Sequence, residues 1–420
     1  MGEDPLVTIV TPCLNAAPFI ARTVESVLSQ DYPHVEYVIM DGGSTDETAS
    51  VVKEYASRLT FISEKDRGQS HAINKGFQMA QGSILGWLNS DDLYLPGCVR
   101  SAVDAFQRNA AAGAVYGEGY LIDSSGNTSR RFPDTEAFNL WKLVYLSDYI
   151  LQQSVYFRKE VLDDLGYLDE DLHYTMDWDL LIRIGMKYQV EYVPEYMGCL
   201  REYPEAKSFS GGVKRVREIR RMLLRHTGLR VSPGYVVYGL GTYHKLWCDR
   251  IDHALAPMLK PVSEKLKSVV RLGAGLIISH TIKDSQGLYP DGWVGRSLNY
   301  MLPAGVGGFV IEGCLPNSDR LGEQRLHVRA NGVSLGRWVV RAGDFQIKVP
   351  VPRGIASEPL RLRIEASQWV VKERLGVSGD RRRVAYRLKS IRWEHAPAES
   401  LPIAVPASSL SFESGSHATR

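Results

Sequence analysis

Acidic and amide side chains follow three predicted strands near the amino-terminal end of the sequence. Asp41 comes directly after an apolar run at Val35 to Met40, Asp66 follows Leu59 to Ile62, and Asn89-Ser90-Asp91-Asp92 follows Ser83 to Leu88. Carboxylates at one edge of a sheet repel one another unless a cation or a hydrogen-bond donor lies between them. A nucleotide diphosphate with Mg²⁺ or Mn²⁺ meets that need, because hard cations bridge carboxylates to phosphate oxygens. The pattern predicts a nucleotide site with Asp91 as its metal ligand.

The Asn89 to Asp92 string has a simpler interpretation when it is taken alone. Short runs of Asn, Ser and Asp often form a turn and then cap a helix, and Pro96 follows closely. The elements around the string and the order of similar features along the chain must decide between the two interpretations.

The first two hundred residues alternate short apolar strands with amphipathic helical stretches, which predicts an α/β, Rossmann-like fold with a mostly parallel sheet. Strands are expected at Val7 to Thr11, Val35 to Met40, Leu59 to Ile62 and Ser83 to Leu88, and helices at Ala17 to Ser29, Asp46 to Ser57 and Gln69 to Ala80. In such sheets ligands bind at the carboxyl ends of the strands, which is where the acidic residues lie.

The remainder of the chain predicts two further kinds of structure and a tail. Residues 201–283 hold 16 Lys or Arg and 6 Asp or Glu, an excess of ten positive charges, with helices expected at Val213 to His226 and Tyr243 to Val270. Residues 284–396 predict an antiparallel β-sandwich, because short β-rich runs alternate with Gly, Pro and Asn. The Ser-, Ala- and Pro-rich residues 397–420 are expected to be disordered.

Composition sets the class of protein and the expected compartment. The 420 residues are 44% hydrophobic and 23% charged, a globular balance with room for two or three domains. No apolar run reaches the roughly 18 to 20 residues that cross a bilayer, and the first residues do not resemble a signal peptide. The five cysteines form no CxxC pair. We therefore expect a cytoplasmic protein.

Four segments in order resemble family 2 glycosyltransferases with the GT-A fold, over about residues 5–200. They are Val7 to Asn15, Val38 to Asp46, Asp66 to Gly76 and Trp87 to Asp92. The resemblance implies transfer of a sugar from a nucleotide-diphosphate sugar to an acceptor hydroxyl, in bacterial polysaccharide or glycoconjugate synthesis.

The same resemblance assigns roles to single residues of the donor site. It places Pro12 and Asn15 in the first nucleotide-binding loop, lets Asp41 accept a hydrogen bond from the base, and sets Arg67 near the diphosphate. Asp66, Ser90 and Asp92 join this donor site. The family's metal motif usually reads Asp-x-Asp, whereas this chain has Asn89 first and Asp91 third. Asn89 can bond a ribose hydroxyl but adds no charge, so the metal affinity is expected to be modest.

The segment His173 to Arg183 resembles the family's motif that carries the general base, which is Asp177 here. Met176 precedes it where an acidic residue is commoner, and losing that charge would lower the pKa of the base relative to relatives. Asp179 is the rival, with an alternative role as a helix N-terminal charge or partner of Arg183. Trp178 could stack on an acceptor sugar or simply pack.

Two further residues are candidates for the acceptor side. Gln152 and Gln153 are polar residues at the start of a predicted apolar strand, so one of them is expected to face the acceptor. The acceptor-binding set is therefore Gln152, Gln153, Trp178 and Asp179. A base on one side of the anomeric carbon and a metal on the other imply one in-line displacement, which inverts the sugar without a covalent intermediate.

The basic segment and the predicted sandwich suggest binding partners for the protein. The basic segment suits anionic lipid headgroups, and so peripheral contact with the inner face of the cytoplasmic membrane, although a solvated face is an equal alternative. No nucleic-acid module accompanies it. The sandwich loosely resembles carbohydrate-binding modules, which suggests binding of a saccharide, lipid-linked saccharide or polymer acceptor, or homo-oligomerisation. The sandwich has five aromatic residues that could bind sugar rings or, as the alternative, pack in its core: Trp293, Tyr300, Trp338, Trp369 and Trp393.

Two rival functions belong to other classes. An NAD-linked oxidoreductase or a nucleotidyltransferase would carry a glycine-rich loop after the first strand, and Thr11 to Asn15 is not one. A non-catalytic carbohydrate-binding protein on a degenerate transferase scaffold is the other alternative, which the departures at Asn89 and Met176 favour.

Overall fold

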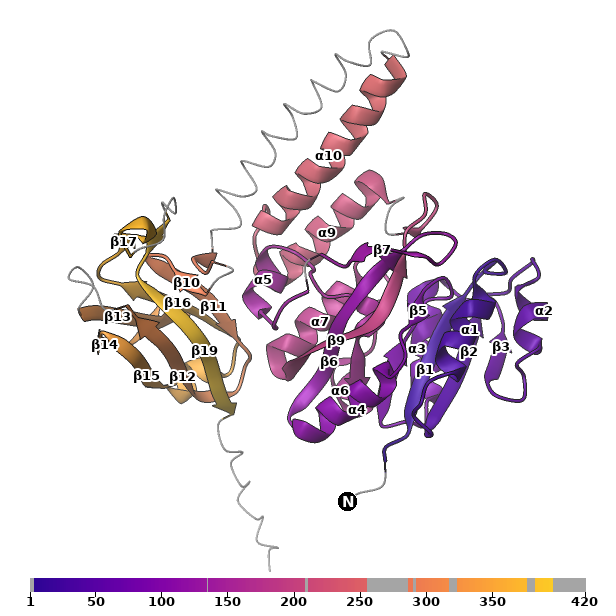
Figure 1. Cartoon of the computed structure of the whole chain (residues 1–420), viewed down its shortest axis with the longest axis horizontal. Helices are drawn as coiled ribbons and strands as arrows, with labels where there is room; N and C mark the ends of the chain where they lie inside the picture. The colour runs from indigo at the N-terminus through magenta and orange to yellow at the C-terminus, as the bar shows by residue number, and fades with distance from the viewer. Residues whose placement is uncertain are drawn as a thin grey trace, which may run out of the picture.

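A computed structural model describes residues 4–133, 135–207, 211–254, 286–289, 292–316, 323–375 and 382–395. Figure 1 shows a large sheet with helices against it, a helix pair beside it, and a separate antiparallel region. The predicted tail and the second half of the helix expected at Tyr243 to Val270 lie outside the described residues. No helix among the described residues is both long and apolar enough to cross a membrane.

The large sheet is mixed, with strand order β3-β2-β1-β4-β8-β6-β9-β5 and β7 paired to β6. Its strands are β1 (Val7–Cys13), β2 (Val35–Asp41), β3 (Thr60–Ser63), β4 (Ile84–Trp87), β5 (Leu93–Tyr94), β6 (Ala112–Ile122), β7 (Thr128–Arg131), β8 (Tyr156–Arg158) and β9 (Gln189–Arg201). The first four strands are parallel, as predicted, so their carboxyl ends meet at one edge. Antiparallel β8 then joins β4 to β6.

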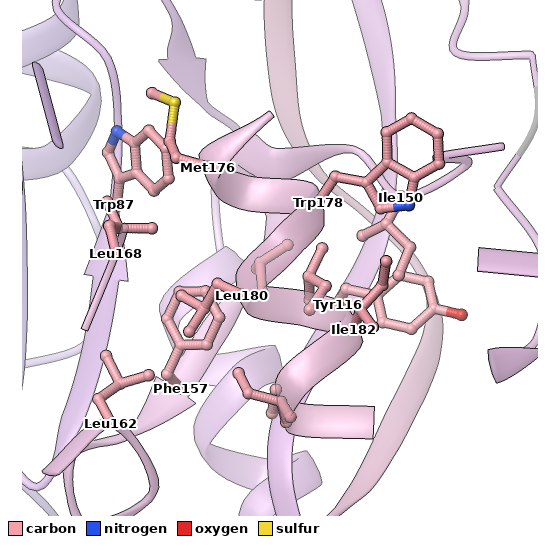
Figure 2. Packing of buried hydrophobic residues seen from close by; sticks show 14 of the residues in the cluster. Trp87, Tyr116, Ile150, Phe157, Leu162, Leu168, Met176, Trp178, Leu180 and Ile182 are labelled. Atoms are coloured by element: carbon pink, nitrogen blue, oxygen red, sulfur yellow. The ribbon is translucent and has the colours of Figure 1, made fainter. Parts of the chain in front are cut away.

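Both faces of this sheet are buried, because alternate residues of a strand point to opposite sides. Ile9 of β1 belongs to one apolar cluster and Val10 to the other. The helices of this part are α1 (Ile20–Leu28), α2 (Thr48–Lys53), α3 (Gln69–Met79), α4 (Cys98–Arg108), α5 (Leu140–Tyr145), the 3₁₀ turn η1 (Gln152–Ser154), α6 (Lys159–Leu165) and α7 (Met176–Lys187). Figure 2 shows Trp87 near Met176 and Phe157 near Leu180, and Met176 and Leu180 belong to the first turns of α7. This packing fixes where α7 begins, and with it Asp177.

The basic segment forms two packed helices, α9 (Gly212–Thr227) and α10 (Pro233–Ala254). The first agrees with the helix predicted at Val213 to His226, and it buries one stripe that includes Val216, Ile219 and Leu223. The second starts ten residues earlier than the predicted Tyr243. Ser232 caps it by accepting the Tyr235 amide at 3.2 Å, and a proline suits the first helical position.

The C-terminal part is a separate antiparallel region, as predicted, and we call it the two-sheet region. Its sheets have the orders β10-β19-β12-β15 and β11-β16-β13-β14. The strands are β10 (Trp293–Val294), β11 (Ser297–Leu302), β12 (Val306–Leu315), β13 (Glu323–Ala330), β14 (Val333–Arg341), β15 (Gly343–Pro350), β16 (Leu360–Ala366) and β19 (Tyr386–His395), beside the short pair β17 (Val370–Val371) and β18 (Arg383–Val384). Residues of both sheets share one apolar cluster, against which Trp293, Tyr300, Trp338 and Trp393 pack. Trp369, by contrast, is 39% exposed.

The two-sheet region touches the large sheet's domain through β11 and the turn that follows it. The Ala304 amide donates to the Met186 carbonyl at 2.8 Å, and Asn139 donates to Gln286 at 3.1 Å. Met301 is buried in the apolar cluster of the large domain. In Figure 1, β11 accordingly lies on the side of the two-sheet region that faces α5 and α7.

Candidate active site

A cleft of about 840 Å³ opens at the carboxyl ends of the parallel strands and extends to the first turn of α7. It gathers most of the residues that the sequence predicts for the site. Those lining it are Pro12, Asn15, Asp66, Asn89, Ser90, Asp91, Asp92, Gln152, Gln153, Asp177 and Trp178. Asp41, Arg67 and Asp179 do not line it. The predicted donor edge and the predicted base therefore share one cavity.

The first loop after β1 is held in shape by the loop after β2. Asn15 has a φ of 51°, a left-handed conformation that Asn tolerates better than most residues. Its amide donates to Ser44 Oγ at 2.8 Å, and its side-chain oxygen accepts the Thr45 amide at 2.9 Å. Both loops are thereby ordered at the cleft edge.

Asp41 lies beneath these loops rather than in the cleft, and it is only 2% exposed. It accepts hydrogen bonds from Ser44 Oγ at 2.5 Å and Ser63 Oγ at 2.5 Å. Burial acts to raise the pKa of Asp41, but these hydrogen bonds stabilise the carboxylate and bring the pKa below its ordinary value. The contact with a donor base stays a prediction, since the carboxylate is here engaged by the chain itself.

Asp66 and Arg67 differ in position although they are neighbours. Asp66 lines the cleft and accepts the Gly68 amide at 2.8 Å. A Cβ at Gly42 would lie 2.6 Å from Asp66 Oδ2, so the glycine allows this close approach. The Arg67 guanidinium is 70% exposed and pairs with Glu170 at 2.5 Å, and its predicted place near a diphosphate stays a prediction.

Both the oxygen and the nitrogen of the Asn89 side chain form hydrogen bonds within the protein. Its side-chain oxygen accepts Trp87 Nε1 at 2.7 Å and Gln69 Nε2 at 2.7 Å. Its side-chain nitrogen donates to Asp92 Oδ2 at 2.9 Å and Gln152 Oε1 at 3.2 Å. A carboxylate at position 89 could not donate to Asp92. The departure from Asp-x-Asp therefore has a physical reason in this chain.

Asp92 is the buried centre of the turn, at 1% exposure. Besides Asn89, it receives Gln153 Nε2 at 2.6 Å and the Arg201 amide at 2.9 Å. Burial and the neighbouring Asp91 raise its pKa. Its carboxyl group borders the cleft and is held by these three donors, and the predicted donor contact stays a prediction.

The glutamines correct one prediction from the sequence. They lie in η1 and do not begin a strand, since β8 starts only at Tyr156. Gln152 Nε2 donates to the Trp87 carbonyl at 2.7 Å, and Gln153 donates to Asp92. At 8% and 3% exposure, they brace the Asn89 to Asp92 turn, and an acceptor contact stays a prediction.

Asp91 is the carboxylate of this turn that remains available to a cation. Its Oδ2 accepts the Tyr203 hydroxyl at 2.7 Å, while Oδ1 has no hydrogen bond within the described part of the chain. No three metal-ligating side chains of the described residues are close enough to enclose a metal. One carboxylate fits Mg²⁺ or Mn²⁺ that arrives with phosphate oxygens of a donor, which is how such ions are commonly held.

The Asp177 carboxylate lines the cleft at the first turn of α7. Its Oδ1 accepts the Trp178 amide at 2.9 Å. Burial raises its pKa, while nearby Lys207 and Arg215 act to lower it. Lys207 itself has a pKa lowered to about 8 by burial, and it donates to Gln69 Oε1 at 2.5 Å. Lys207 thus connects the donor edge to the start of α7.

Asp148 is a residue of the cleft that the sequence analysis missed. It follows α5, lines the cleft with Asp177, and accepts the Ile150 amide at 3.2 Å. Burial raises its pKa, and the charge of Asp177 raises it further. The absence of an acidic residue at Met176 predicts a lower pKa for Asp177 than in relatives, and this comparison stays a prediction. In this chain, burial raises the pKa of Asp177 above its ordinary value.

Trp178 and Asp179 are both buried, and an acceptor contact of either residue stays a prediction. Trp178 is 2% exposed, donates to the Leu143 carbonyl at 2.7 Å and packs on Tyr238. Asp179 is 4% exposed and lies outside the cleft, paired with Arg183 at 2.8 Å and His226 at 2.7 Å. Burial acts to raise the pKa of Asp179, but its two partners bring it below the ordinary value. Asp179 therefore fits the role of partner for Arg183.

Arg201 and Tyr203 also come from outside the predicted motifs. Arg201 is 1% exposed, donates to the Asp91 carbonyl at 2.6 Å, and lies over the Phe19 ring. Its Nη2 is buried without a partner among the described residues. No signal in the sequence marks these residues, because they reach the turn from the far end of β9.

The Asn89 substitution predicts a stability effect. Asn89→Asp restores the family's motif but sets a carboxylate against buried Asp92 and removes two donated hydrogen bonds. We expect a loss of roughly 1 to 3 kcal/mol in the free energy of unfolding, measured by urea titration. The double variant Asn89→Asp with Asp92→Asn should recover part of the loss, because the donor returns. Wild-type stability of Asn89→Asp would refute this account.

The raised pKa of Asp148 predicts how stability depends on pH. The folded form holds a proton that the unfolded form releases above about pH 3.9, so stability falls as pH rises from there toward the raised folded pKa. Asp148→Asn should remove this fall, by at most about 1.4 kcal/mol per pH unit. Urea titrations at pH 5 and pH 8 should show the variant gaining on wild type at the higher pH. The control Asp171→Asn, at an exposed position, should show no such gain. An equal response of Asp148→Asn at both pH values would contradict the buried, protonated state.

Comparison with known proteins agrees with the cleft. Residues 8–166 match the family model described as glycosyl transferase family 2. An uncharacterised glycosyltransferase of Rickettsia typhi is 27% identical over 199 residues, which cover 44% of this chain and 61% of that protein. The solved structure of Staphylococcus aureus TarS 1-349 with UDP-GlcNAc has a TM-score of 0.44 at 14% identity, covering 65% of this chain and 81% of the other.

One relative is covered more completely. A PGL/p-HBAD biosynthesis glycosyltransferase of Mycobacterium bovis is 30% identical over 184 residues, covering 43% of this chain and 69% of that protein. The chain spans 61% and 58% of the length of the two Rickettsia relatives that match first. Because residues 8–166 match the family model and the Mycobacterium bovis relative is 30% identical over 69% of its length, the chain belongs to glycosyl transferase family 2.

Proposed function

We propose that the protein is an inverting glycosyltransferase that moves a sugar from a nucleotide-diphosphate sugar to an acceptor hydroxyl in bacterial polysaccharide or glycoconjugate synthesis. The observation that carries the proposal is one cleft lined by Asp91 at the strand ends and by Asp177 at the start of α7. The first is a ligand for a cation and the second a base. The donor sugar, the base of the nucleotide and the linkage are left open.

Asp177 is suited to take the proton of the acceptor hydroxyl. Its Oδ1 is held by the Trp178 amide, whereas Oδ2 has no hydrogen bond within the described residues and can receive the proton. A raised pKa makes the carboxylate a stronger base, and Lys207 and Arg215 favour its ionised form. When bound at Asp91, Mg²⁺ or Mn²⁺ would neutralise charge on the leaving diphosphate.

The second carboxyl supports a single displacement. A double displacement needs an ionised nucleophile next to the sugar. The raised pKa of Asp148 keeps that group protonated while Asp177 is ionised, because two buried carboxyls do not ionise together easily. A protonated carboxyl does not act as a nucleophile.

The non-catalytic alternative loses its support in the structure. It depended on Asn89 and Met176 as signs of degeneration. Asn89 forms four hydrogen bonds, and an aspartate could not reproduce the two that it donates. Met176 removes an acidic neighbour of Asp177, but Asp148 brings a second carboxyl group to the cleft. Neither departure removes Asp91 or Asp177 from the cleft.

A donor screen tests the proposal by measuring release of nucleotide diphosphate with and without Mn²⁺. Asp177→Asn should lower kcat by roughly 10²- to 10⁴-fold without weakening nucleotide binding, because only the base is lost. Asp91→Ala should abolish the response to Mn²⁺. Asp171→Asn makes the same chemical change at an exposed position and should keep full activity. Full transfer by Asp177→Asn would refute the assigned base.

Contact with an anionic membrane is part of the proposal and rests on one surface. Leu229 and Val231, in the connection between α9 and α10, are 45% and 61% exposed. Arg220 donates to the Arg230 carbonyl at 3.2 Å, which brings basic side chains beside them. Exposed apolar residues next to cations are typical of surfaces that enter the headgroup region.

Vesicle flotation tests this contact. Wild type should float with vesicles that contain phosphatidylglycerol and should not float with pure phosphatidylcholine. Leu229→Asp with Val231→Asp should lose most of the floating fraction, because it places two charges at the headgroup boundary. Met79→Asp, a control at a position 43% exposed on α3, should float like wild type. Unchanged flotation of the double variant would exclude this surface.

A further inference from the structure

The outward face of the sheet β11-β16-β13-β14 is covered with arginines, and we call it the arginine face. Inward residues of its strands, such as Leu326 and Val328, are fully buried in the core of the two-sheet region. The outward positions alternate with them and are exposed. The arginines on this face are Arg325, Arg329, Arg337, Arg341, Arg361 and Arg363. With Glu323 and Glu365 as its acidic residues, the face has an excess of four positive charges.

Two of the arginines lie against one another, since Arg329 of β13 is directly opposite Arg363 of β16. Arg341 of β14, by contrast, lies opposite Glu323 of β13. Of the six, only Arg363 has an ion pair within the described part of the chain, with Glu365 at 3.2 Å. Like charges directly opposite in a sheet destabilise it. The arrangement therefore has a cost for folding that an anion bound between the arginines would remove.

Protection of a sheet edge does not explain the pattern. Charged residues on edge strands prevent pairing with other chains, which would account for Arg337 and Arg341 on β14. Arg329 and Arg363 lie on β13 and β16, which are interior strands. Lysine would also serve at an edge, whereas arginine presents a planar fork that matches carboxylate and phosphate oxygens in pairs.

The chemistry of the face favours a polysaccharide over a membrane or a nucleic acid. By strand register, no Phe, Tyr or Trp points outward from the four strands, and the main exposed apolar residue is Val339 at 56%. Membrane surfaces need apolar or aromatic residues that insert, and single-stranded nucleic acids need aromatic rings for stacking. Cations on a flat sheet suit a chain with regularly repeated anionic groups.

The face begins close to the cleft. Met301 of β11 lies opposite Arg361 and is buried in the apolar cluster of the large domain. Helix α5 packs between them, since it contacts β11 on one side and α7 on the other. The Leu143 carbonyl of α5 also receives Trp178 Nε1. In Figure 1, α5 lies between β11 and α7, and it contacts both.

We propose that the arginine face binds an acidic polysaccharide acceptor and holds the polymer beside the cleft. The inference rests on the proposed function and specifies its acceptor class. A polymer that spans α5 would contact both sites, so binding at the face would raise the concentration of acceptor ends at Asp177.

Binding to immobilised polygalacturonate tests the proposal, with neutral dextran as the reference surface. Wild type should bind polygalacturonate in a salt-sensitive way and should not bind dextran. Arg325→Gln with Arg329→Gln and Arg363→Gln should weaken binding about tenfold, given modest contributions from each exposed pair. The control Lys53→Gln with Arg108→Gln and Lys348→Gln removes equal charge at exposed positions elsewhere and should bind like wild type.

Several results would overturn the proposal. These are wild-type binding by the arginine variant, an equal loss in the control, absence of polygalacturonate binding, or a preference for phosphatidylglycerol vesicles or single-stranded DNA. Titration of UDP and GDP in the same samples separates the two levels of inference. Normal nucleotide binding without polymer binding refutes only the proposal that the acceptor is an acidic polysaccharide. Polymer binding without nucleotide binding or turnover refutes the proposed transferase function.

Discussion

Burial of the Asp92 carboxyl is the constraint on which the candidate site depends. A carboxyl removed from water is costly unless its oxygens receive hydrogen bonds. Here the donors come from Asn89, Gln153 and the Arg201 backbone, which belong to three separate parts of the chain. These segments must meet before the carboxyl is satisfied. Asp91, the neighbour of Asp92 in the same turn, lines the cleft.

That constraint changes how the motif should be judged. From the sequence, Asn89 is a lost ligand and the two glutamines are candidates for the acceptor. In the structure they are one hydrogen-bonded unit with Asp92, in which each amide supplies a donor that a carboxylate lacks. A substitution in a family motif is therefore informative only beside its spatial partners. The same holds for Met176, since a second carboxyl group, that of Asp148, reaches the cleft from another element.

The sequence predicted what depends on local pattern and missed what depends on long-range contact. Strands β1 to β4 and helix α3 were predicted within a few residues, because hydrophobic period is a local property. The prediction that Asp66 and Asp91 lie at the same edge of the sheet followed from the rule that ligands bind at the carboxyl ends of parallel strands. Asp148, Lys207 and Tyr203 carry no local signal, since the fold alone brings them to the cleft. The glutamines were placed in a strand because nothing local shows that their side chains bind the Asn89 turn.

Charge is distributed over the chain in a way that the net value of +2 conceals. The cleft concentrates carboxyls, because a base and a cation ligand are both acidic groups. An acidic acceptor would be repelled from such a centre if nothing else held it. Arg201 and Arg215 already line the cleft, and six further arginines there would pair with Asp91 and Asp177 and weaken both. Placing them on a separate sheet avoids this, since charges more than about 8 Å apart in water are largely screened at physiological salt. The proposed division between an acidic centre and a basic holding surface follows from that screening length.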